Sequence, residues 1–454
     1  MTSTTDQGSE GTKRAGTVRK GVLGNRDFAK LWSGETVSLL GSQITEFTLP
    51  LVAIITLGAT AFEVGLLNAA RYVPVVMVSL FAGVWLDRVR RRPVLINSNF
   101  GRAALIALVP LAALTGVLSM ELLYLVAITV GALTVIFDVG VLSYLPGLVE
   151  RRHLGDANGK IQTSFALAGI AGPGLAGLLV GLLEPPIVLA FDTATYLASA
   201  VLLLAIRRPE PLPAQPADRP SVTASIGEGL RTVFGSPMLR QLLAQSATFN
   251  LFQNAVLTVF VVYAVRELGL SPAQLGIVVG AGSVGALVGA LLSNRIREAL
   301  GFGRALLVVT VTACLAQLPL LVPRSGSVPS MMLLAAVLAI FGASLTIYNV
   351  STLTLRQAVT PNRLLARMNA SYRMILFGSA PVGALLGGTL AGVVGLRSAL
   401  VVAVVGVTTP LLWTFFSPVY RLTEIPTAPE EPAAPGSSTP SPAATSGDPS
   451  DRQE

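Results

Sequence analysis

The chain has one cysteine, one histidine and few charged residues, and these shortages exclude several classes of protein. Cys314 stands alone in an apolar run, so neither a disulfide framework nor a cysteine metal site is available. We expect the single histidine, His153, in a solvated loop. Charged residues make up only 12% of the 454 residues, well below the roughly 25% of a soluble domain.

Motifs that carry common enzyme chemistry are also missing. There is no phosphate-binding GxxxxGK[ST], and neither HExxH nor GxSxG occurs at membrane depth. The titratable residues within apolar segments are scattered rather than convergent. We therefore expect no enzyme activity, no cofactor and no metal.

Long apolar runs dominate what is present. The chain is 52% hydrophobic and has a mean hydropathy of +0.68. Each run can cross a bilayer, since about 20 helical residues span the hydrocarbon core. The first run is longer than needed, so we expect its N-terminal part, beginning with Asn25 to Trp32, at the membrane interface. The twelve runs lie near residues 28–57, 62–86, 94–118, 121–145, 160–182, 186–206, 239–265, 272–294, 303–322, 328–350, 369–394 and 397–417.

The distribution of basic residues predicts that both termini lie in the cytoplasm. Only Arg266, Arg324 and Arg397 fall in loops that join an odd-numbered span to the next one, whereas most of the 32 lysines and arginines lie on the other side. The net charge of +8 is spread over short loops, so nucleic acid is not an expected partner. Residues 1–27 are polar and the first run is too long for a signal peptide. A multi-pass protein of the cell membrane is expected.

Composition and weak internal similarity divide the chain into two related halves. The sequence around Leu145 and Gly172-Pro173-Gly174 has a counterpart around Leu355 and Ala380-Pro381-Val382-Gly383, as expected for two parallel six-helix repeats. The fold prediction is an all-α integral membrane protein with twelve transmembrane helices in two pseudo-symmetric bundles. Its expected segments are a disordered N-terminus (1–24), a first bundle (25–206), a cytoplasmic central loop (207–238), a second bundle (239–418) and a disordered Pro-rich tail (419–454).

A basic turn between the second and third runs supplies the most specific motif. Residues 83–95 read GVWLDRVRRRPVL and place one acid among four arginines. The pattern GxxxDRxxRRxxL resembles the signature of the major facilitator superfamily, with Arg90 where the family pattern has glycine. Together with the sequences at 25–32 and 38–43, this is similar to the branch that holds macrolide-efflux and enterobactin-exporter proteins. The matching residues are Gly83, Asp87, Arg88, Arg91 and Arg92.

The resemblance implies that this turn closes a cytoplasmic gate. In the family, the acid after helix two caps a helix of the other half, and an anion at a helix N-terminus is stabilised by about 0.3–1 kcal/mol. Span eleven is expected to begin near Arg367, which gives Asp87 such a partner. Asp138, about two turns from the end of span four, is a plausible partner for Arg91 or Arg102. The alternative is a topology anchor in which the arginines only fix orientation.

Span five carries a second motif. Ala168-x-x-x-Gly172-Pro173-x-x-Ala176-Gly177 resembles the GxxxGPxxGG pattern of drug-exporting members, with alanine in two glycine positions. Small residues let helices approach closely, and proline removes a backbone hydrogen bond and kinks the helix. The motif favours export over uptake, although generic helix packing explains the same residues.

Charged residues at membrane depth mark the expected transport path. Glu46 in span one and Arg71 in span two lie at similar depth, and either one alone costs about 2.5–3.5 kcal/mol at the bilayer centre. We expect them to pair, either as a coupling site that exchanges Arg71 for a proton or a cationic substrate, or as a static link between helices. Asp192 lies near the outer end of span six, where an interfacial helix cap is expected.

The polar residues of the second half are neutral. Gln253 and Asn254 lie near the middle of span seven, where amides could hydrogen-bond a substrate in an apolar cavity or join helices. An acidic first half facing a neutral second half suits a bulky, partly apolar molecule.

These features favour a secondary transporter that exports small hydrophobic or amphipathic compounds, such as drugs or natural products. The expected mechanism is proton antiport with alternating access. The expected partners are the small-molecule substrate, protons and the lipid bilayer, and a monomer is expected. An importer of a small nutrient and a non-transporting scaffold or receptor are the alternatives.

Overall fold

The computed structural model describes residues 22–86, 88–150, 153–210, 222–361, 364–415 and 418–421, and within them every regular element is a helix. The elements are η1 (Val22–Gly24), α1 (Arg26–Leu51), η2 (Val52–Thr56), α2 (Ala61–Leu86), α3 (Arg91–Leu114), α4 (Met120–Leu148), α5 (Leu154–Leu182), α6 (Pro185–Leu204), α7 (Val222–Gly235), α8 (Pro237–Arg266), α9 (Pro272–Leu300), α10 (Phe302–Leu315), η4 (Leu318–Leu321), α11 (Val328–Val359), α12 (Leu365–Val394), α13 (Leu396–Gly406), α14 (Pro410–Phe415) and η6 (Pro418–Arg421).

Twelve segments of the described chain are long and apolar enough to cross a membrane, which confirms the all-α, twelve-span prediction. Three spans are composite: η2 continues α1, η4 continues α10, and α13 with α14 forms the last one. The terminal segments that the sequence assigned to disorder lie outside the described residues, apart from a few residues next to the bundles. One of these is Val22, which is buried and forms a short helical turn with its two exposed neighbours.

Local sequence explains where several helices begin. Asn25 accepts hydrogen bonds from the backbone N–H groups of Asp27 and Phe28 and so caps α1. Ser271 and Gln274 form a capping box at the start of α9, with Pro272 at its first position. These side chains satisfy backbone donors that lack partners within the helix.

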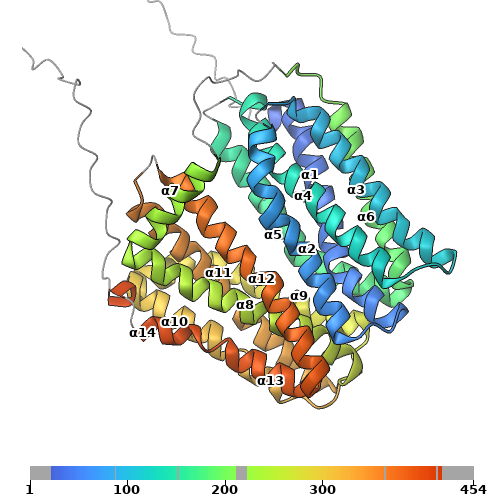
Figure 1. Ribbon diagram of the computed structural model, residues 1–454, viewed down its shortest axis with the longest axis vertical. Coiled ribbons are helices and arrows are strands. Elements are labelled where there is room, and N and C mark those ends of the chain that lie inside the picture. Colours follow the sequence, from blue (N-terminus) through green and yellow to red (C-terminus); the bar gives the residue numbers. More distant parts are fainter. Residues whose placement is uncertain are drawn as a thin grey trace, which may run out of the picture.

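The helices form two bundles, coloured blue to green and green to red in Figure 1. In the first bundle, α1 packs on α5 and α6, while α3 packs on α4 and α6 and α2 packs on α4. In the second, α8 packs on α12 and α13, and α11 packs on α9 and α10. The bundles meet mainly through α2 with α12 and α5 with α9, and α2 also contacts α8.

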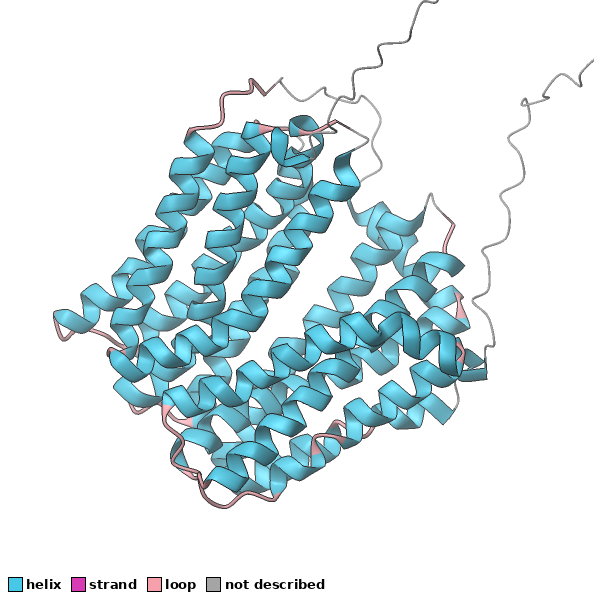
Figure 2. Ribbon diagram, turned by 180° about the vertical axis from the view of Figure 1, so that it is seen from behind, coloured by secondary structure: helices cyan, strands magenta, loops and turns pink. Residues whose placement is uncertain are grey.

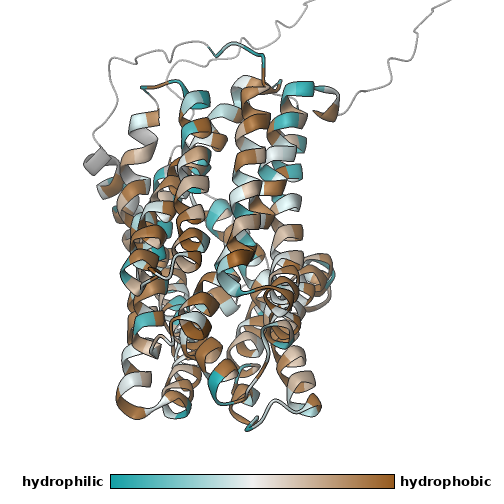
Figure 3. Cartoon of the chain, turned by 90° about the vertical axis from the view of Figure 1, so that its right-hand side faces the viewer, coloured by the Kyte–Doolittle hydropathy of each residue, from teal (hydrophilic) through white to brown (hydrophobic). Residues whose placement is uncertain are grey.

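We call the end of the molecule that carries Arg88–Arg92 the signature face and the other end the opposite face. The even number of spans returns the described chain to the signature face, where both of its ends lie. Apolar residues cover most of the helices between the two faces (Figure 3). The bundles are close together toward the opposite face and diverge toward the signature face (Figures 1 and 2).

Glycines allow the close approach at the opposite face. A Cβ on Gly177 of α5 would lie 2.7 Å from the Cα of Gly276 on α9, and a Cβ on Gly65 of α2 would lie 3.0 Å from the Cα of Gly388 on α12. Arg266 adds hydrogen bonds of 2.9 and 2.6 Å from its guanidinium to carbonyl oxygens of the α1–α2 connection. Small residues thus bring the backbones of the two halves into contact, as in other membrane helix pairs.

We predict that Gly177→Val separates α5 from α9 and destabilises the closed opposite face by about 1–3 kcal/mol, the usual cost of overpacking. The measurement is the unfolding temperature of the purified protein in detergent. Gly174→Val is the matched control, because a Cβ at Gly174 on the same helix meets nothing within 4 Å. Equal unfolding temperatures for the two variants would contradict the predicted contact.

Candidate functional site

The interior of the first half contains a buried arginine on α3. Arg102 is 2% exposed, and its guanidinium carbon lies 4.2 Å from the ring centre of Phe137 and 4.3 Å from that of Tyr196. Its Nη2 donates a hydrogen bond to the side chain of Asn99, which in turn donates to Ser199 at 2.9 Å. The aromatic faces attract the cation more strongly than they would in water because the site is desolvated.

Three carboxylates interact electrostatically with this one arginine: Glu35 on α1, Asp138 on α4 and Asp192 on α6. Glu35 is 7% exposed, and its Oε2 has no hydrogen-bond partner within the described residues. Asp138 also acts on Glu35 as a like charge. The three acids and Arg102 therefore form a polar cluster, here called the acid cluster, with more carboxyls than cations.

Asp138 connects this cluster to the other half. Unlike Glu35, it is exposed, and it interacts with Arg373 of α12 as well as with Arg102. Arg373 is also exposed, and its guanidinium carbon lies 5.4 Å from the ring centre of Phe377. Asp138 thus faces the space between the halves, where its charge acts across the interface.

Asp192 is not the interfacial cap that the sequence predicted. It is completely buried and accepts hydrogen bonds from Thr45 at 2.5 Å and from Thr195 at 3.0 Å. The expectation failed because position along span six says nothing about which neighbour covers the residue. A Cβ on Gly41 would lie 2.4 Å from Asp192 Oδ1, so glycine lets α1 close over the carboxylate.

The predicted pair of Glu46 and Arg71 is present. Arg71 Nη2 lies 3.2 Å from Glu46 Oε1, and the two side chains are 24% and 43% exposed, respectively. Gln43 donates a further hydrogen bond to Glu46 at 3.3 Å. The pair joins α1 to α2 and is far more accessible than Glu35.

The neutral amides of the second half hold helices together. Gln253 accepts a hydrogen bond of 2.6 Å from Gln317 at the end of span nine. Asn254 donates to the backbone carbonyl of Asn250 at 2.8 Å, and Asn250 donates to the carbonyl of Leu376 on α12 at 2.7 Å. These contacts fit the joining role that the sequence left open beside substrate binding.

The span-five motif lies at two packing interfaces. A Cβ on Gly172 would lie 2.4 Å from Cβ of Gln43 on α1, so this glycine serves packing within the first half. Gly177 contacts α9, and the carbonyl of Pro173 lies 2.8 Å from the position of a Cβ on Gly276. The motif therefore contributes directly to the contact between halves.

The signature turn is held by a residue that the motif does not include. The backbone N–H groups of Arg91 and Arg92 donate to the carboxylate of Glu210, at 2.8 and 2.9 Å. Arg91 Nη1 also lies 3.9 Å from Glu210 Oε1. Glu210, and not only Asp138 as the sequence suggested, is therefore a candidate partner of Arg91. Asp138 interacts with Arg102, the other predicted partner.

The remaining members of the turn are placed as follows. Gly83 lies in the last turns of α2, and the backbone N–H of Arg88 donates to the carbonyl of Trp85 at 3.0 Å. Arg92 donates to the carbonyl oxygens of Leu203 and Leu204 at the end of α6. Asp87 lies outside the described residues.

The first turn of α12, the expected partner of Asp87, is covered by α7. Arg367 forms an ion pair with Glu228 of α7, and Ser371 donates to the carbonyl of Ile226 at 3.3 Å. A Cβ on Gly229 would lie 2.3 Å from the carbonyl oxygen of Arg367, so glycine permits this contact. The central segment thus supplies an acid at this helix start.

Sequence reasoning did not single out Glu35, Arg373, Glu210 or Glu228. Glu35 lies just beyond the stretch of the first run that was assigned to the interface, and like Glu46 it is an acid within a membrane-spanning helix. That was the available signal, because intramembrane carboxylates are rare and functional by default. Nothing in the sequence indicated that Glu210 would reach the start of α3.

Twelve spans in two bundles that meet along α2, α5, α9 and α12, with charged residues at membrane depth, define a membrane transporter. The model of a family described as transmembrane secretion effector matches residues 21–439. The chain belongs to this family of the major facilitator superfamily, which confirms the predicted resemblance.

Named relatives and a solved structure agree with this assignment. The multidrug efflux pump Tap of Mycolicibacterium fortuitum is 27% identical over 394 residues, covering 82% of this chain and 89% of that protein. The enterobactin exporter EntS of Shigella flexneri is 27% identical over 317 residues, covering 68% and 72%. A bacterial homologue of the human lysosomal transporter Spinster, solved in an inward-facing and unoccupied conformation, superposes with a TM-score of 0.68 at 14% identity, covering 87% and 96%.

We predict that Arg102→Gln lowers the stability of the protein by about 3–5 kcal/mol, the usual loss when buried charge is left without compensation. The physical reason is that three carboxyls lose their shared cation. Thermal unfolding of the purified protein is the readout, and Arg297→Gln on the exposed end of α9 is the control. If both variants unfold at the wild-type temperature, Arg102 does not balance the acid cluster.

Proposed function

We propose that this protein exports small hydrophobic or amphipathic compounds by proton antiport, with alternating access of a central site to the two sides of the membrane. The acid cluster is the observation that carries the proposal. Placing three carboxyls near one buried arginine in a bundle surrounded by lipid is costly when all are ionised. Binding a proton relieves that cost, so the cluster provides a physical means of coupling.

The acid cluster and the Glu46–Arg71 pair would have different functions. The buried Glu35 has an unpartnered oxygen and a like-charged neighbour in Asp138, which suits proton uptake and release. The half-buried pair of Glu46 and Arg71 is accessible to a bound compound and suits recognition of substrate charge. A cationic substrate would replace Arg71 as the partner of Glu46. Gln253 and Asn254 border the second half of this path as neutral groups.

The closed opposite face and the diverging signature face correspond to one of the two access states. We place the signature face in the cytoplasm, together with both termini, because its loops hold most of the basic residues. With this orientation, the arrangement corresponds to the inward-facing state of the proposed transporter, which would act as a monomer in the cell membrane. Gly83, Asp87, Arg88, Arg91 and Arg92 form the turn that would approach α12 when the cytoplasmic side closes. Pro173 and Gly177 would keep the outer side sealed, and Gly172 would hold α5 against α1 within the first half.

Export is favoured over import by two kinds of observation. The span-five motif resembles that of drug exporters, and it lies at the contact between the halves. The relatives Tap and EntS are named as an efflux pump and an exporter. A bulky, partly apolar and cationic substrate fits the acidic first half and neutral second half.

We predict that cells expressing the chain accumulate less of at least one compound from a panel of cationic and neutral antibiotics and dyes. An uncoupler should abolish the difference, because the proton gradient supplies the energy. Uncoupler-sensitive accumulation in the reverse direction would instead indicate an importer. Movement of no compound, at confirmed membrane expression, would favour a scaffold or receptor.

For the same assay we predict different effects of the two acids. Glu35→Gln should abolish uncoupler-sensitive export of every substrate, since the proton site is lost. Glu46→Gln should impair cationic substrates more than neutral ones, since it removes only a charge that faces the path. Glu298→Gln, on an exposed part of α9, is the matched control and should transport normally. If Glu35→Gln transports fully at normal membrane levels, the acid cluster is not the coupling site.

A further inference from the structure

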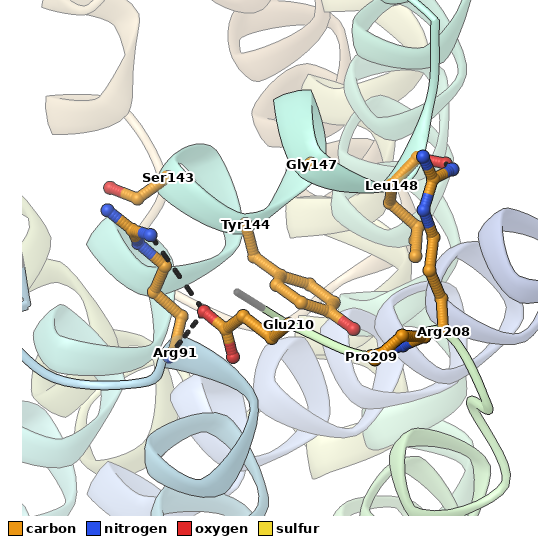
Figure 4. A pocket seen from close by; sticks show the side chains of 8 residues that line it. All are labelled: Arg91, Ser143, Tyr144, Gly147, Leu148, Arg208, Pro209 and Glu210. Carbon is orange, nitrogen blue, oxygen red and sulfur yellow. Dashed lines mark hydrogen bonds and ion pairs between the residues drawn. The ribbon is translucent and has the colours of Figure 1, made fainter. Parts of the chain in front are cut away.

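A partly open cavity of about 100 Å³ lies at the signature face, lined by the start of α3, the last turns of α4 and the segment that follows α6 (Figure 4). The two helices belong to the first half, and the third part is the beginning of the central segment. The cavity is smaller than the roughly 300–1,000 Å³ of a site for a drug-sized molecule. It is therefore separate from a path for bulky substrates and suits a small group.

One wall of the cavity carries an unused hydrogen-bond donor. Tyr144 of α4 is 5% exposed, and its hydroxyl has no hydrogen-bond partner in the described part of the chain. Figure 4 shows this hydroxyl directed toward Pro209 and Arg208. A buried hydroxyl without a partner is costly, so a ligand that accepts its hydrogen bond would be stabilised there.

Arginines line the same cavity. Arg208 is anchored by a hydrogen bond of 2.8 Å from Nη1 to the carbonyl of Leu148. Arg91 faces Glu210 on the other side. Among the residues that line the cavity, two guanidinium groups accompany one carboxylate. The charges of Arg92 and Asp27 also interact electrostatically with Tyr144, and because they are opposite in sign their effects on the hydroxyl oppose each other.

The position of Glu210 shows that the start of α3, on one side of the cavity, stabilises negative charge. Its carboxylate accepts two backbone N–H groups at the start of α3, which is how a helix N-terminus holds an anion. Beside Glu210, the cavity is also lined by Arg208 and by the hydroxyl of Tyr144, which has no hydrogen-bond partner within the described residues. The surroundings are therefore arranged for one more anionic group with several oxygen acceptors.

We propose that the cavity binds a phosphate group, with Tyr144 and Arg208 as direct ligands and Arg91 shared between the phosphate and Glu210. The planar guanidinium fork matches phosphate oxygens. This proposal depends on the proposed function only for the orientation of the protein in the membrane, with the signature face in the cytoplasm. There, the phosphate can come from the headgroup of an anionic phospholipid in the inner leaflet or from a soluble phosphate.

The test uses the purified full-length protein in a neutral detergent. Inorganic phosphate, short-chain phosphatidic acid and short-chain phosphatidylglycerol are titrated by calorimetry, with short-chain phosphatidylcholine as the zwitterionic reference. We expect at least one anionic probe to bind more tightly than phosphatidylcholine. Tyr144→Phe should weaken that binding by about tenfold, because a hydrogen bond to a charged group is lost, and Arg208→Gln should weaken it further.

Matched variants separate the site from general effects. Tyr124→Phe removes a hydroxyl from the other end of α4, where it donates to the carbonyl of Glu63 at 3.5 Å, and should bind as wild type. Arg207→Gln changes the neighbouring arginine and should also retain binding. Without ligand, Tyr144→Phe should unfold at the wild-type temperature or above it, since the hydroxyl has no partner to lose.

The outcomes distinguish the two sources. Tyr144-dependent binding of inorganic phosphate supports a soluble anion as ligand, and Tyr144-dependent binding of the anionic lipids alone supports a headgroup. Binding that is equal for phosphatidylcholine, or unchanged in both Tyr144→Phe and Arg208→Gln, would overturn the proposal. Because calorimetry requires no transport, a failure of the export hypothesis would leave this result intact.

Discussion

The structure depends above all on how charge is accommodated between helices that lipid surrounds. Arg102 is held by two aromatic rings and by Asn99, and three carboxyls share its charge. Without such partners, the free energy of transferring each ion from water into the bundle would be uncompensated. The acid cluster joins α1, α3, α4 and α6, so the same residues that raise the cost of burial also fix how these helices pack. A change of protonation in the acid cluster therefore alters interactions among four helices of the first half.

The two faces of the molecule use different interactions between the halves. At the opposite face, glycines bring backbones into contact along α2 with α12 and α5 with α9, which gives a closely packed seam. At the signature face, polar groups from the central segment contact each half separately: Glu210 holds the start of α3, and Glu228 holds the first turn of α12. Backbone contact seals one end, whereas exchangeable ion pairs occupy the other. This difference is suited to a transporter whose halves rock about a closed end.

The signature turn illustrates how far a motif can predict a site. The pattern located the turn and its arginines, and the pairing of Glu46 with Arg71 followed from their equal depth. Partners from distant segments could not be read in the same way. Glu210 reaches Arg91 because α6 ends beside the start of α3. Asp138 on α4 interacts electrostatically with Arg373 on α12, in the other half. Both interactions depend on how distant helices are arranged, and hydropathy does not specify that arrangement.

The sequence by itself determined that the chain is helical, crosses the membrane twelve times and resembles the major facilitator superfamily, because the length of apolar runs and the spacing of a motif are local properties. Only the tertiary structure decided that Asp192 is buried, that Glu35 is left with an unpartnered oxygen and that Tyr144 lines a cavity with Arg208. It also decided that Gln253 and Asn254 make contacts between and within helices. Burial and pairing depend on the surfaces that distant helices bring together, and a single residue's place along its own span does not reveal them.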